Sequence, residues 1–154
     1  MKKLILLSVT LALLFGIACK KEKQKKVDKP VSEMLRGTWF TTLEKYEYFN
    51  ASNVKEYEES KTPGVQYIIN NQVTRKNAQG VKDLVTDYSV STVNGKYYIS
   101  FNQNGISETF QIVSVDDKIM VWTQEKKNQM YNSSGDKMAA KQQLTINFHC
   151  PCRD

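Results

Sequence analysis

Apolar and polar residues alternate through most of the chain after residue 36, and this period of two predicts β-strands rather than helices. Tyr, Val, Ile, Thr and Phe dominate these runs, which suits strands with one buried face. We expect strands at 37–49, 53–59, 65–70, 71–76, 84–92, 96–102, 107–115, 118–126 and 144–149. One helical turn is expected at 32–36, and 138–142 is expected to be a short helix or a connection.

Short turn motifs separate the predicted strands. Asn94-Gly95 and Asn104-Gly105 each lie between two β-rich runs, and both residues of a type I′ turn need a positive φ. Asp116-Asp117 is expected to be a third tight turn. Because strands joined by short turns pair antiparallel, the sequence predicts an all-β, up-and-down meander. Such a meander usually closes into a β-barrel, because closure removes the exposed edges.

The first 18 residues have the pattern of a signal peptide. Lys2 and Lys3 precede an uncharged apolar run, 4–17, which is shorter than the roughly 20 residues that a transmembrane helix needs. Residues 20–30 contain one Val and no aromatic residue, so they cannot bury enough apolar surface to fold. We therefore expect a signal peptide at 1–18, a disordered tether at 19–30 and one β-barrel domain at 31–154.

The net charge of +6 belongs to the N-terminal residues. Lys2, Lys3 and the six lysines of 19–30, offset by Glu22 and Asp28, account for all of it, so residues 31–154 carry no net charge. Nucleic-acid binding needs a basic surface, so we expect no nucleic-acid partner. The basic tether is expected either to be a soluble spacer or to attract anionic head groups of a membrane.

Gly16-Ile17-Ala18-Cys19 resembles the lipobox of bacterial lipoproteins, with Gly16 at the position where Leu is usual. The resemblance implies that the chain is cut before Cys19 and that Cys19 carries fatty acyl chains such as palmitate. It also implies a lipid-anchored protein of the bacterial cell envelope, and Lys20 after the Cys implies the outer membrane. The alternative is an ordinary secretory signal with an unrelated Cys near its end.

Leu35-Arg36-Gly37-Thr38-Trp39 resembles the Gly-x-Trp opening strand of lipocalins and other calycins, and in particular of small lipocalin-like lipoproteins of bacteria. The resemblance implies a lipocalin-like β-barrel in which Trp39 plugs the closed end. From the residues alone, it is equally possible that Trp39 is an ordinary buried tryptophan of a strand, without the role it has in lipocalins. Most members of this group have no assigned activity, so the resemblance implies a fold rather than a function.

No arrangement of residues in the sequence is typical of a catalytic site, and we expect neither enzyme activity nor a cofactor. His149 is the single histidine and lies close to the C-terminus, which leaves no Ser–His–Asp set. Glu56, Glu58 and Glu59 are the densest carboxylates, but they lie in a polar run. A solvated surface is therefore expected there rather than a buried catalytic pair.

Aromatic side chains are the candidate ligand-binding groups. Apolar pockets with a few polar groups often lie at the mouths of barrels. We expect Trp39, Tyr88, Tyr97, Phe101 and Trp122 to line such a pocket. The alternative is that these rings fill the barrel, because a barrel of about eight strands is only just wide enough for its side chains or one small ligand.

His149, Cys150 and Cys152 form one compact set of soft metal ligands near the C-terminus. Copper or zinc binding, a disulfide, and two idle thiols are the alternatives. Phe148 is expected to be the last inward residue of the final strand. Because Pro151 cannot extend a strand ladder, Cys150 and Cys152 are expected to lie in an exposed end beyond the barrel.

Two functions from different classes fit these expectations. The first, which we favour, is a lipid-anchored barrel that binds a small apolar or amphipathic ligand. The second is a protein-interaction module with a filled barrel, whose partner is an envelope factor, a host component or an enzyme to be inhibited. An open apolar cavity supports the first function, whereas a filled barrel with a large exposed aromatic patch supports the second.

Overall fold

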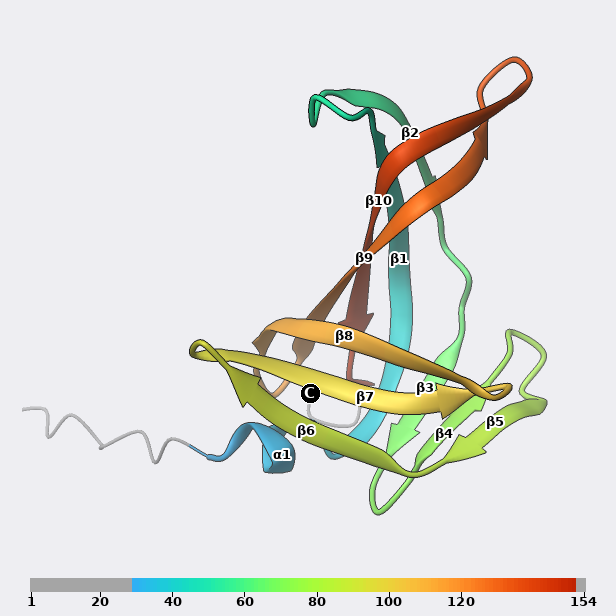
Figure 1. The fold of residues 1–154 in the computed structure, drawn as a ribbon. Coiled ribbons are helices and arrows are strands. Elements are labelled where there is room, and N and C mark those ends of the chain that lie inside the picture. Colours follow the sequence, from blue (N-terminus) through green and yellow to red (C-terminus); the bar gives the residue numbers. More distant parts are fainter. Residues whose placement is uncertain (1–28, 152–154) are drawn as a thin grey trace, which may run out of the picture.

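The computed structural model describes residues 29–151, which form an antiparallel β-structure with one short helix (Figure 1). The elements are α1 (Val31–Met34), β1 (Gly37–Phe49), β2 (Lys55–Lys61), β3 (Gln66–Ile69), β4 (Val73–Lys76), β5 (Lys82–Thr86), β6 (Tyr88–Val93), β7 (Lys96–Gln103), β8 (Ile106–Val115), β9 (Ile119–Asn132) and β10 (Asp136–His149). The predicted all-β class is therefore confirmed.

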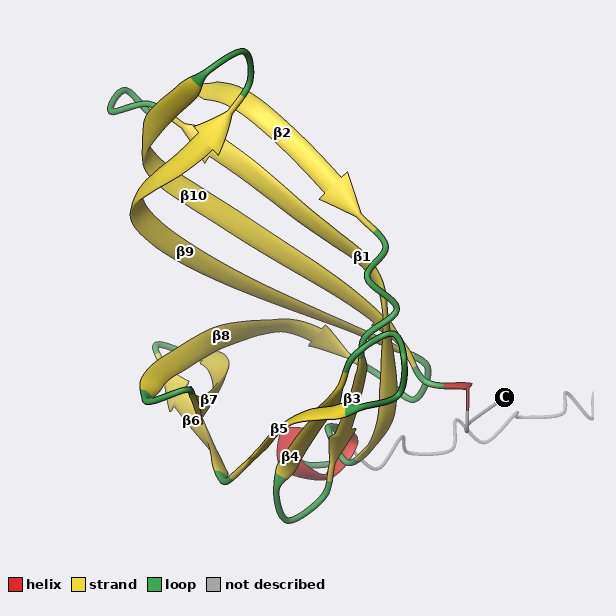
Figure 2. Ribbon diagram, turned by 90° about the vertical axis from the view of Figure 1, so that its right-hand side faces the viewer, coloured by secondary structure: helices red, strands yellow, loops and turns green. Residues whose placement is uncertain are grey.

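The strands form a meander that wraps into a nearly closed barrel (Figure 2). Their order is β5-β4-β3-β1-β10-β9-β8-β7-β6, and β2 pairs with the remaining part of β1. The first strand therefore pairs with the last strand on one side and with β3 and then β2 on the other. The predicted antiparallel, up-and-down barrel is confirmed by this order.

Asn-Gly turns form where the sequence predicts them. Asn94 and Gly95 have φ values of 49° and 74°, and Asn104 and Gly105 have values of 54° and 82°. These positive values are what a type I′ turn requires, and glycine adopts them without the steric cost of a Cβ. The two turns place β6, β7 and β8 side by side.

The barrel is incomplete at a seam between β5 and β6. The predicted single strand 84–92 is wrong, because the chain turns a corner at Asp87 and the two halves join different neighbours. β5 pairs with β4, whereas β6 pairs with β7. β5 also approaches β7, which brings the two edges of the sheet close together.

Large side chains fill the barrel interior. Trp39, Trp122 and Phe148 are fully or almost fully buried, and Trp122 packs against Phe148 with ring centroids 4.8 Å apart. The indole N–H of Trp39 donates a hydrogen bond of 2.7 Å to the carbonyl of Leu35, which joins α1 to β1. The same cluster includes Tyr67, Ile69, Val73, Ile99, Phe101, Phe110, Ile112, Met120 and Ile146.

Three barrel strands, β1, β9 and β10, continue beyond the barrel and form a separate arm with β2 (Figures 1 and 2). We use the term arm for residues 44–49, 55–61, 124–132 and 136–144, in the order β2-β1-β10-β9. β8 pairs with β9 only as far as Thr123, so no barrel strand accompanies β9 into the arm. The expected helix or connection at 138–142 is wrong, because these residues pair with β9 as part of β10.

The arm has its own small core of stacked tyrosines. Tyr131 stacks on Tyr48 and Tyr57, with ring centroids 4.9 Å and 5.4 Å apart. Tyr48 and Tyr131 are buried together with Ala139, and Tyr46 packs against them. The arm is therefore held by a second apolar cluster that is distinct from the barrel interior.

The predicted signal peptide, Cys19 and most of the tether lie outside the described residues, so these predictions remain open. Among residues 29–151, none of the helical residues forms a span long and apolar enough to cross a membrane.

Candidate ligand-binding site

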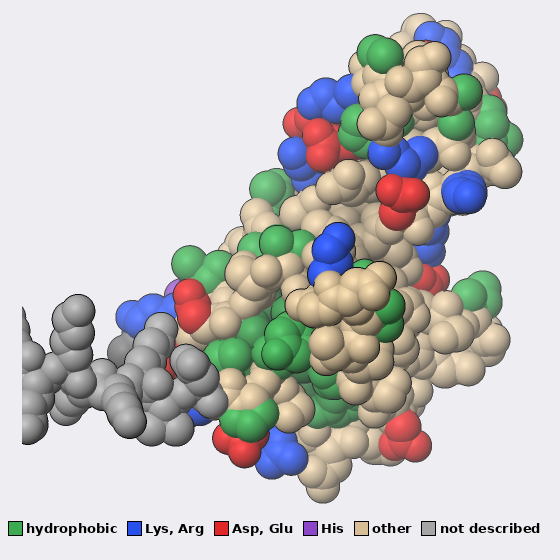
Figure 3. All heavy atoms as spheres, turned by 60° about the vertical axis from the view of Figure 1, so that its left-hand side comes forward, with side chains coloured by type: hydrophobic (Ala, Val, Ile, Leu, Met, Phe, Trp, Pro, Cys, Tyr) green, Lys and Arg blue, Asp and Glu red, His purple; other side chains and the backbone are tan. Residues whose placement is uncertain are grey.

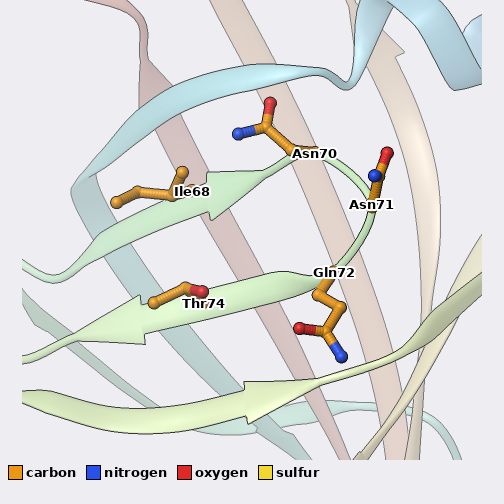
Figure 4. Close-up of a pocket in the computed structure, with 5 residues that line it drawn as sticks. All are labelled: Ile68, Asn70, Asn71, Gln72 and Thr74. Carbon is orange, nitrogen blue, oxygen red and sulfur yellow. The ribbon is translucent and has the colours of Figure 1, made fainter.

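Two open pockets lie at the surface on either side of the seam, and each has a volume of about 340 Å³. The first is lined by Ile68, Asn70, Asn71, Gln72 and Thr74, on the β3–β4 hairpin (Figure 4). The second is lined by Asp87, Tyr88, Ser89, Ser100, Phe101, Asn102 and Ser107, on β6, β7 and β8. We call them the hairpin pocket and the seam pocket.

Hydrogen bonds join the two pockets across the corner of the chain. The hydroxyl of Tyr88 donates to the carbonyl of Asn70 at 2.9 Å, and the side-chain amide of Gln72 donates to the carboxylate of Asp87 at 2.9 Å. These two bonds hold the start of β6 against the β3–β4 turn. The seam is therefore a fixed part of the fold rather than a loose end.

The seam pocket combines two aromatic rings with a polar rim. Tyr88 and Phe101 are directly opposite each other in the β6–β7 register, and Phe101 is stacked on Phe110 at 5.7 Å. Ser100 shares a hydrogen bond of 2.8 Å with Thr109, which fixes its hydroxyl. Because Phe101 is buried and neighbouring strand residues face opposite sides of the sheet, the part of this lining that solvent reaches is mostly polar.

Side chains on the hairpin pocket are mostly amides. Figure 4 shows Asn70, Asn71 and Gln72 around the turn, with Ile68 and Thr74 on the adjoining strands. Ile68 and Thr74 are a cross-strand pair, so they share one face of the hairpin. This pocket is more polar than the seam pocket, and it offers neutral donors and acceptors instead of an aromatic surface.

Only two of the five predicted ligand residues lie together in a pocket. Tyr88 and Phe101 line the seam pocket, whereas Trp39 and Trp122 are fully buried in the barrel. Tyr97 lies at the opposite end of β7, with 42% of its surface exposed. Because the interior is filled, the two pockets lie at the seam rather than in the centre of the barrel.

One polar atom of the barrel interior has no hydrogen-bond partner among the described residues. It is the indole nitrogen of Trp122, whose ring is surrounded by Tyr67, Phe101, Phe110 and Phe148. An unpaired buried N–H carries a desolvation cost of about 1–3 kcal/mol. The aromatic packing around this ring therefore has to outweigh that cost.

Sequence reasoning missed the polar members of the seam pocket. Asp87, Ser89, Ser100, Asn102 and Ser107 are ordinary strand and turn residues in sequence. Ser89 and Ser100 are a cross-strand pair next to Tyr88 and Phe101, which places them at the pocket once the register is known. The pattern of apolar residues does not predict this register, because the register depends on the corner at Asp87, directly before β6 begins. The alternation continues through that corner without a break.

Cys150 does not lie in an exposed end. It is 1% exposed within the barrel cluster, and its amide donates a hydrogen bond of 2.9 Å to the carbonyl of Lys118. The expectation of an exposed Cys150 is therefore wrong, because backbone pairing with the β8–β9 turn continues past β10.

Cys152 lies outside the described residues, so the metal set of His149, Cys150 and Cys152 stays a prediction. Residues 29–151 contain no group of three His, Cys, Asp or Glu that could hold a metal.

Glu56, Glu58 and Glu59, the closely spaced carboxylates of the sequence, form structural contacts in the arm. Glu59 accepts a hydrogen bond of 2.8 Å from Tyr48, and Glu56 accepts one of 3.0 Å from Tyr131. Glu58 pairs with Lys55 at 2.7 Å, and this ammonium group lowers the pKa of Glu58. These contacts give the three carboxylates a role in the arm, and the absence of enzyme activity stays a prediction.

Comparison of the chain with protein-family models, with curated protein sequences and with solved structures finds no match.

Proposed function

We propose that this chain is a lipid-anchored protein of the bacterial cell envelope whose barrel binds a small amphipathic ligand in the seam pocket. The observation that carries the ligand proposal is an open depression of about 340 Å³ over β6, β7 and β8, lined by Tyr88 and Phe101 together with Asp87, Asn102 and three serines. The partly exposed ring of Tyr88 offers an apolar contact for such a ligand, and the hydroxyl, amide and carboxylate groups of the lining offer hydrogen bonds to its polar part.

The filled barrel refines the original ligand hypothesis. Trp39, Trp122 and Phe148 occupy the interior, so a ligand that replaced them would remove the packing that stabilises the fold. A site at the seam avoids this conflict. It lies where the sheet is not continuous, so ligand entry requires no strand to separate from its neighbour.

Native mass spectrometry of the protein purified from its own host tests the ligand proposal. The expected result is a retained small molecule that is lost from a Ser107→Trp variant, because the larger side chain fills the seam pocket. A Ser114→Trp variant is the matched control, since Ser114 is also exposed on β8 but does not line the pocket. No bound molecule in the parent protein, or one that both variants retain, would contradict the proposal.

The anchor rests on the apolar run at 4–17 and on the lipobox-like segment that ends at Cys19. A Cys19→Ala variant is expected to lose fatty-acid labelling and to leave the membrane fraction. Stable anchoring needs two signals, such as two acyl chains, which the variant cannot carry. If the variant stays in the membrane fraction at high salt, Cys19 is not the anchor.

The arm supports a second candidate function, which is the binding of a protein partner. Met130 and Met138 are a cross-strand pair on the β9–β10 hairpin and are 61% and 60% exposed. Methionine is common at adaptable protein-binding surfaces because its side chain is flexible and polarisable.

A photo-crosslinking residue at Met138 is expected to capture one protein in intact cells if this function is correct. The same residue at Val81, which is 59% exposed, is the control.

A further inference from the structure

Exposed apolar side chains gather at the end of the barrel where the described chain begins. Val93, Val113 and Ile119 are each more than half exposed, and Tyr97 is 42% exposed. Figure 3 faces this side and shows hydrophobic side chains gathered in a hollow. We call these four residues the apolar rim.

The strand register places the rim residues at one end of the barrel. Val93 and Lys96 flank the Asn94-Gly95 turn between β6 and β7, and Tyr97 is one residue further into β7, on the other face of the sheet from Val93. Tyr97 pairs with Ile112 of β8, and Val113 is the bulged residue that follows it. Ile119 begins β9 after the turn at Asp116, so the β6–β7 and β8–β9 turns lie at the same end.

The N-terminal segment enters the fold at this end. The ammonium group of Lys29 lies 4.0 Å from the carboxylate of Asp117, in the β8–β9 turn. α1 follows directly, and the side chain of Leu35 is fully buried in the barrel cluster. The described chain therefore begins next to the apolar rim (Figure 1).

The distance from the anchor to the rim is short. Cys19 is ten positions before Lys29, and ten residues span at most about 33–36 Å when fully extended. An acylated Cys19 would thus confine the rim to a thin layer above the head groups, which raises its effective concentration at the bilayer. The lysines of the tether add attraction to anionic lipids of about 1 kcal/mol each near the surface.

The rim itself is suited to apolar rather than ionic contact. In the segments that form this end of the barrel, 29–36, 93–97 and 113–119, the basic and acidic residues nearly balance, and they are Lys29, Arg36, Lys96 and Lys118 against Glu33, Asp116 and Asp117. Tyrosine is favoured at the membrane interface because one end of its side chain is apolar and the other is polar. Three aliphatic residues beside such a tyrosine match the boundary between head groups and acyl chains.

We propose that the apolar rim rests on the lipid bilayer and fixes the orientation of the barrel on the membrane. This inference depends on the proposed lipid anchor. In this orientation the seam pocket lies farther from the bilayer than the rim, because Phe101 lies four residues further along β7 than Tyr97, or roughly 13 Å at the rise of a strand. The pocket therefore stays open to ligands in the aqueous phase.

Site-specific photo-crosslinking of the full-length protein tests this orientation. A benzophenone amino acid replaces Ile119 or Val93, and the acylated protein is placed in vesicles of phosphatidylethanolamine and phosphatidylglycerol. Phospholipid adducts are expected at both positions, several-fold above those at Val85 and Met138. These two controls are 55% and 60% exposed but lie away from the rim, on β5 and at the arm.

The same samples separate failure of the orientation from failure of the anchor. The mass of the N-terminal peptide reports whether Cys19 is acylated. An acylated Cys19 with equal lipid adducts at all four positions would overturn the orientation alone, and an unmodified Cys19 without adducts would overturn both proposals. In intact cells, protein adducts in place of lipid adducts at Ile119 would show that the rim is a protein-binding surface, and would overturn the orientation as well.

Discussion

Trp39 connects the start of the barrel to its core through both packing and hydrogen bonding. Its ring is fully buried, and its indole N–H donates to the carbonyl of Leu35 at 2.7 Å. Trp39→Ala is expected to lower the free energy of unfolding by about 3–5 kcal/mol. Trp39→Phe should cost less, because it keeps an aromatic ring and loses the hydrogen bond. Urea denaturation measures both, and a loss below about 1 kcal/mol for Trp39→Ala would contradict the core position.

Cys150 is expected to be protected from alkylation in the native state, because it is 1% exposed and packs in the barrel cluster. Iodoacetamide should label it only when urea unfolds the protein, as read by peptide mass mapping. Deletion of residues 150–154 is then expected to lower the unfolding midpoint, because it removes a buried side chain and the bond to Lys118. Rapid native labelling of Cys150, or a deletion with no effect on stability, would contradict this position.

The error at Cys150 shows how far alternation can be extended along a strand. Alternation correctly places Phe148 inside, and the same period returns to the inside at residue 150. We expected the strand to end because Pro151 lacks an amide hydrogen. The amide of Cys150 is one position earlier, and its partner is the carbonyl of Lys118, in a turn far away in sequence. Local residue preferences cannot reveal such a partner.

At the scale of elements, the predicted strand bounds agree best with the structure where one face of the strand is clearly apolar and the other clearly polar. β1, β7 and β8 match the expected ranges closely, because their apolar residues alternate and their ends carry turn motifs. β9 and β10 extend much further than expected, through lysines, glutamines and alanines that favour helices in isolation. Pairing between these two strands and the tyrosine cluster of the arm outweighs that preference.

The tyrosines of the arm are expected to make its stability depend on alkaline pH. Burial is the first cause that raises the pKa of Tyr46, Tyr48 and Tyr131 above 10.0, and neighbouring Glu carboxylates raise it further. The unfolded chain therefore ionises its tyrosines first, and the stability that these phenols contribute is full below about pH 10. It is lost as the pH rises through their folded-state pKa values. Urea midpoints measured together with phenolate absorbance should show this loss.

Tyr131→Phe provides the matched comparison for the alkaline experiment. It keeps the ring that stacks on Tyr48 and Tyr57 but removes the hydroxyl that donates to Glu56. The variant should lose less stability than the parent between neutral and alkaline pH, because one fewer phenol ionises. An equal loss in both proteins would show that the phenol of Tyr131 does not contribute to the alkaline dependence.

For the whole molecule, the sequence predicts the closed meander but not its seam, and it leaves open whether the interior is filled. Leu84, Thr86, Tyr88, Val90 and Thr92 keep one period of two across Asp87, so periodicity alone predicts a single strand. The corner arises because the two halves pair with different strands, which is a property of the closed sheet. Whether aromatic rings fill a barrel or line a cavity likewise depends on packing in three dimensions, which is why Trp39 and Trp122 were grouped with Tyr88.

The two apolar clusters predict two units of unequal stability within one molecule. The barrel cluster contains 14 buried residues, whereas the arm cluster contains Tyr48, Tyr131 and Ala139. Local opening is easiest where few apolar contacts must be broken. Amide hydrogen exchange is therefore expected to be faster at 46–49 and 129–139 than at 97–101 and 120–122, with mass spectrometry of peptides as the measurement.

Two variants decide whether the arm opens independently of the barrel. Tyr131→Ala removes the ring that stacks on Tyr48 and Tyr57, so it should speed exchange in the arm and leave the barrel unchanged. Val73→Ala removes buried methyl groups from the barrel cluster, so it should speed exchange in the barrel through global unfolding. If both variants speed exchange equally in both regions, the arm and the barrel are one cooperative unit. The arm would then move only when the whole protein unfolds.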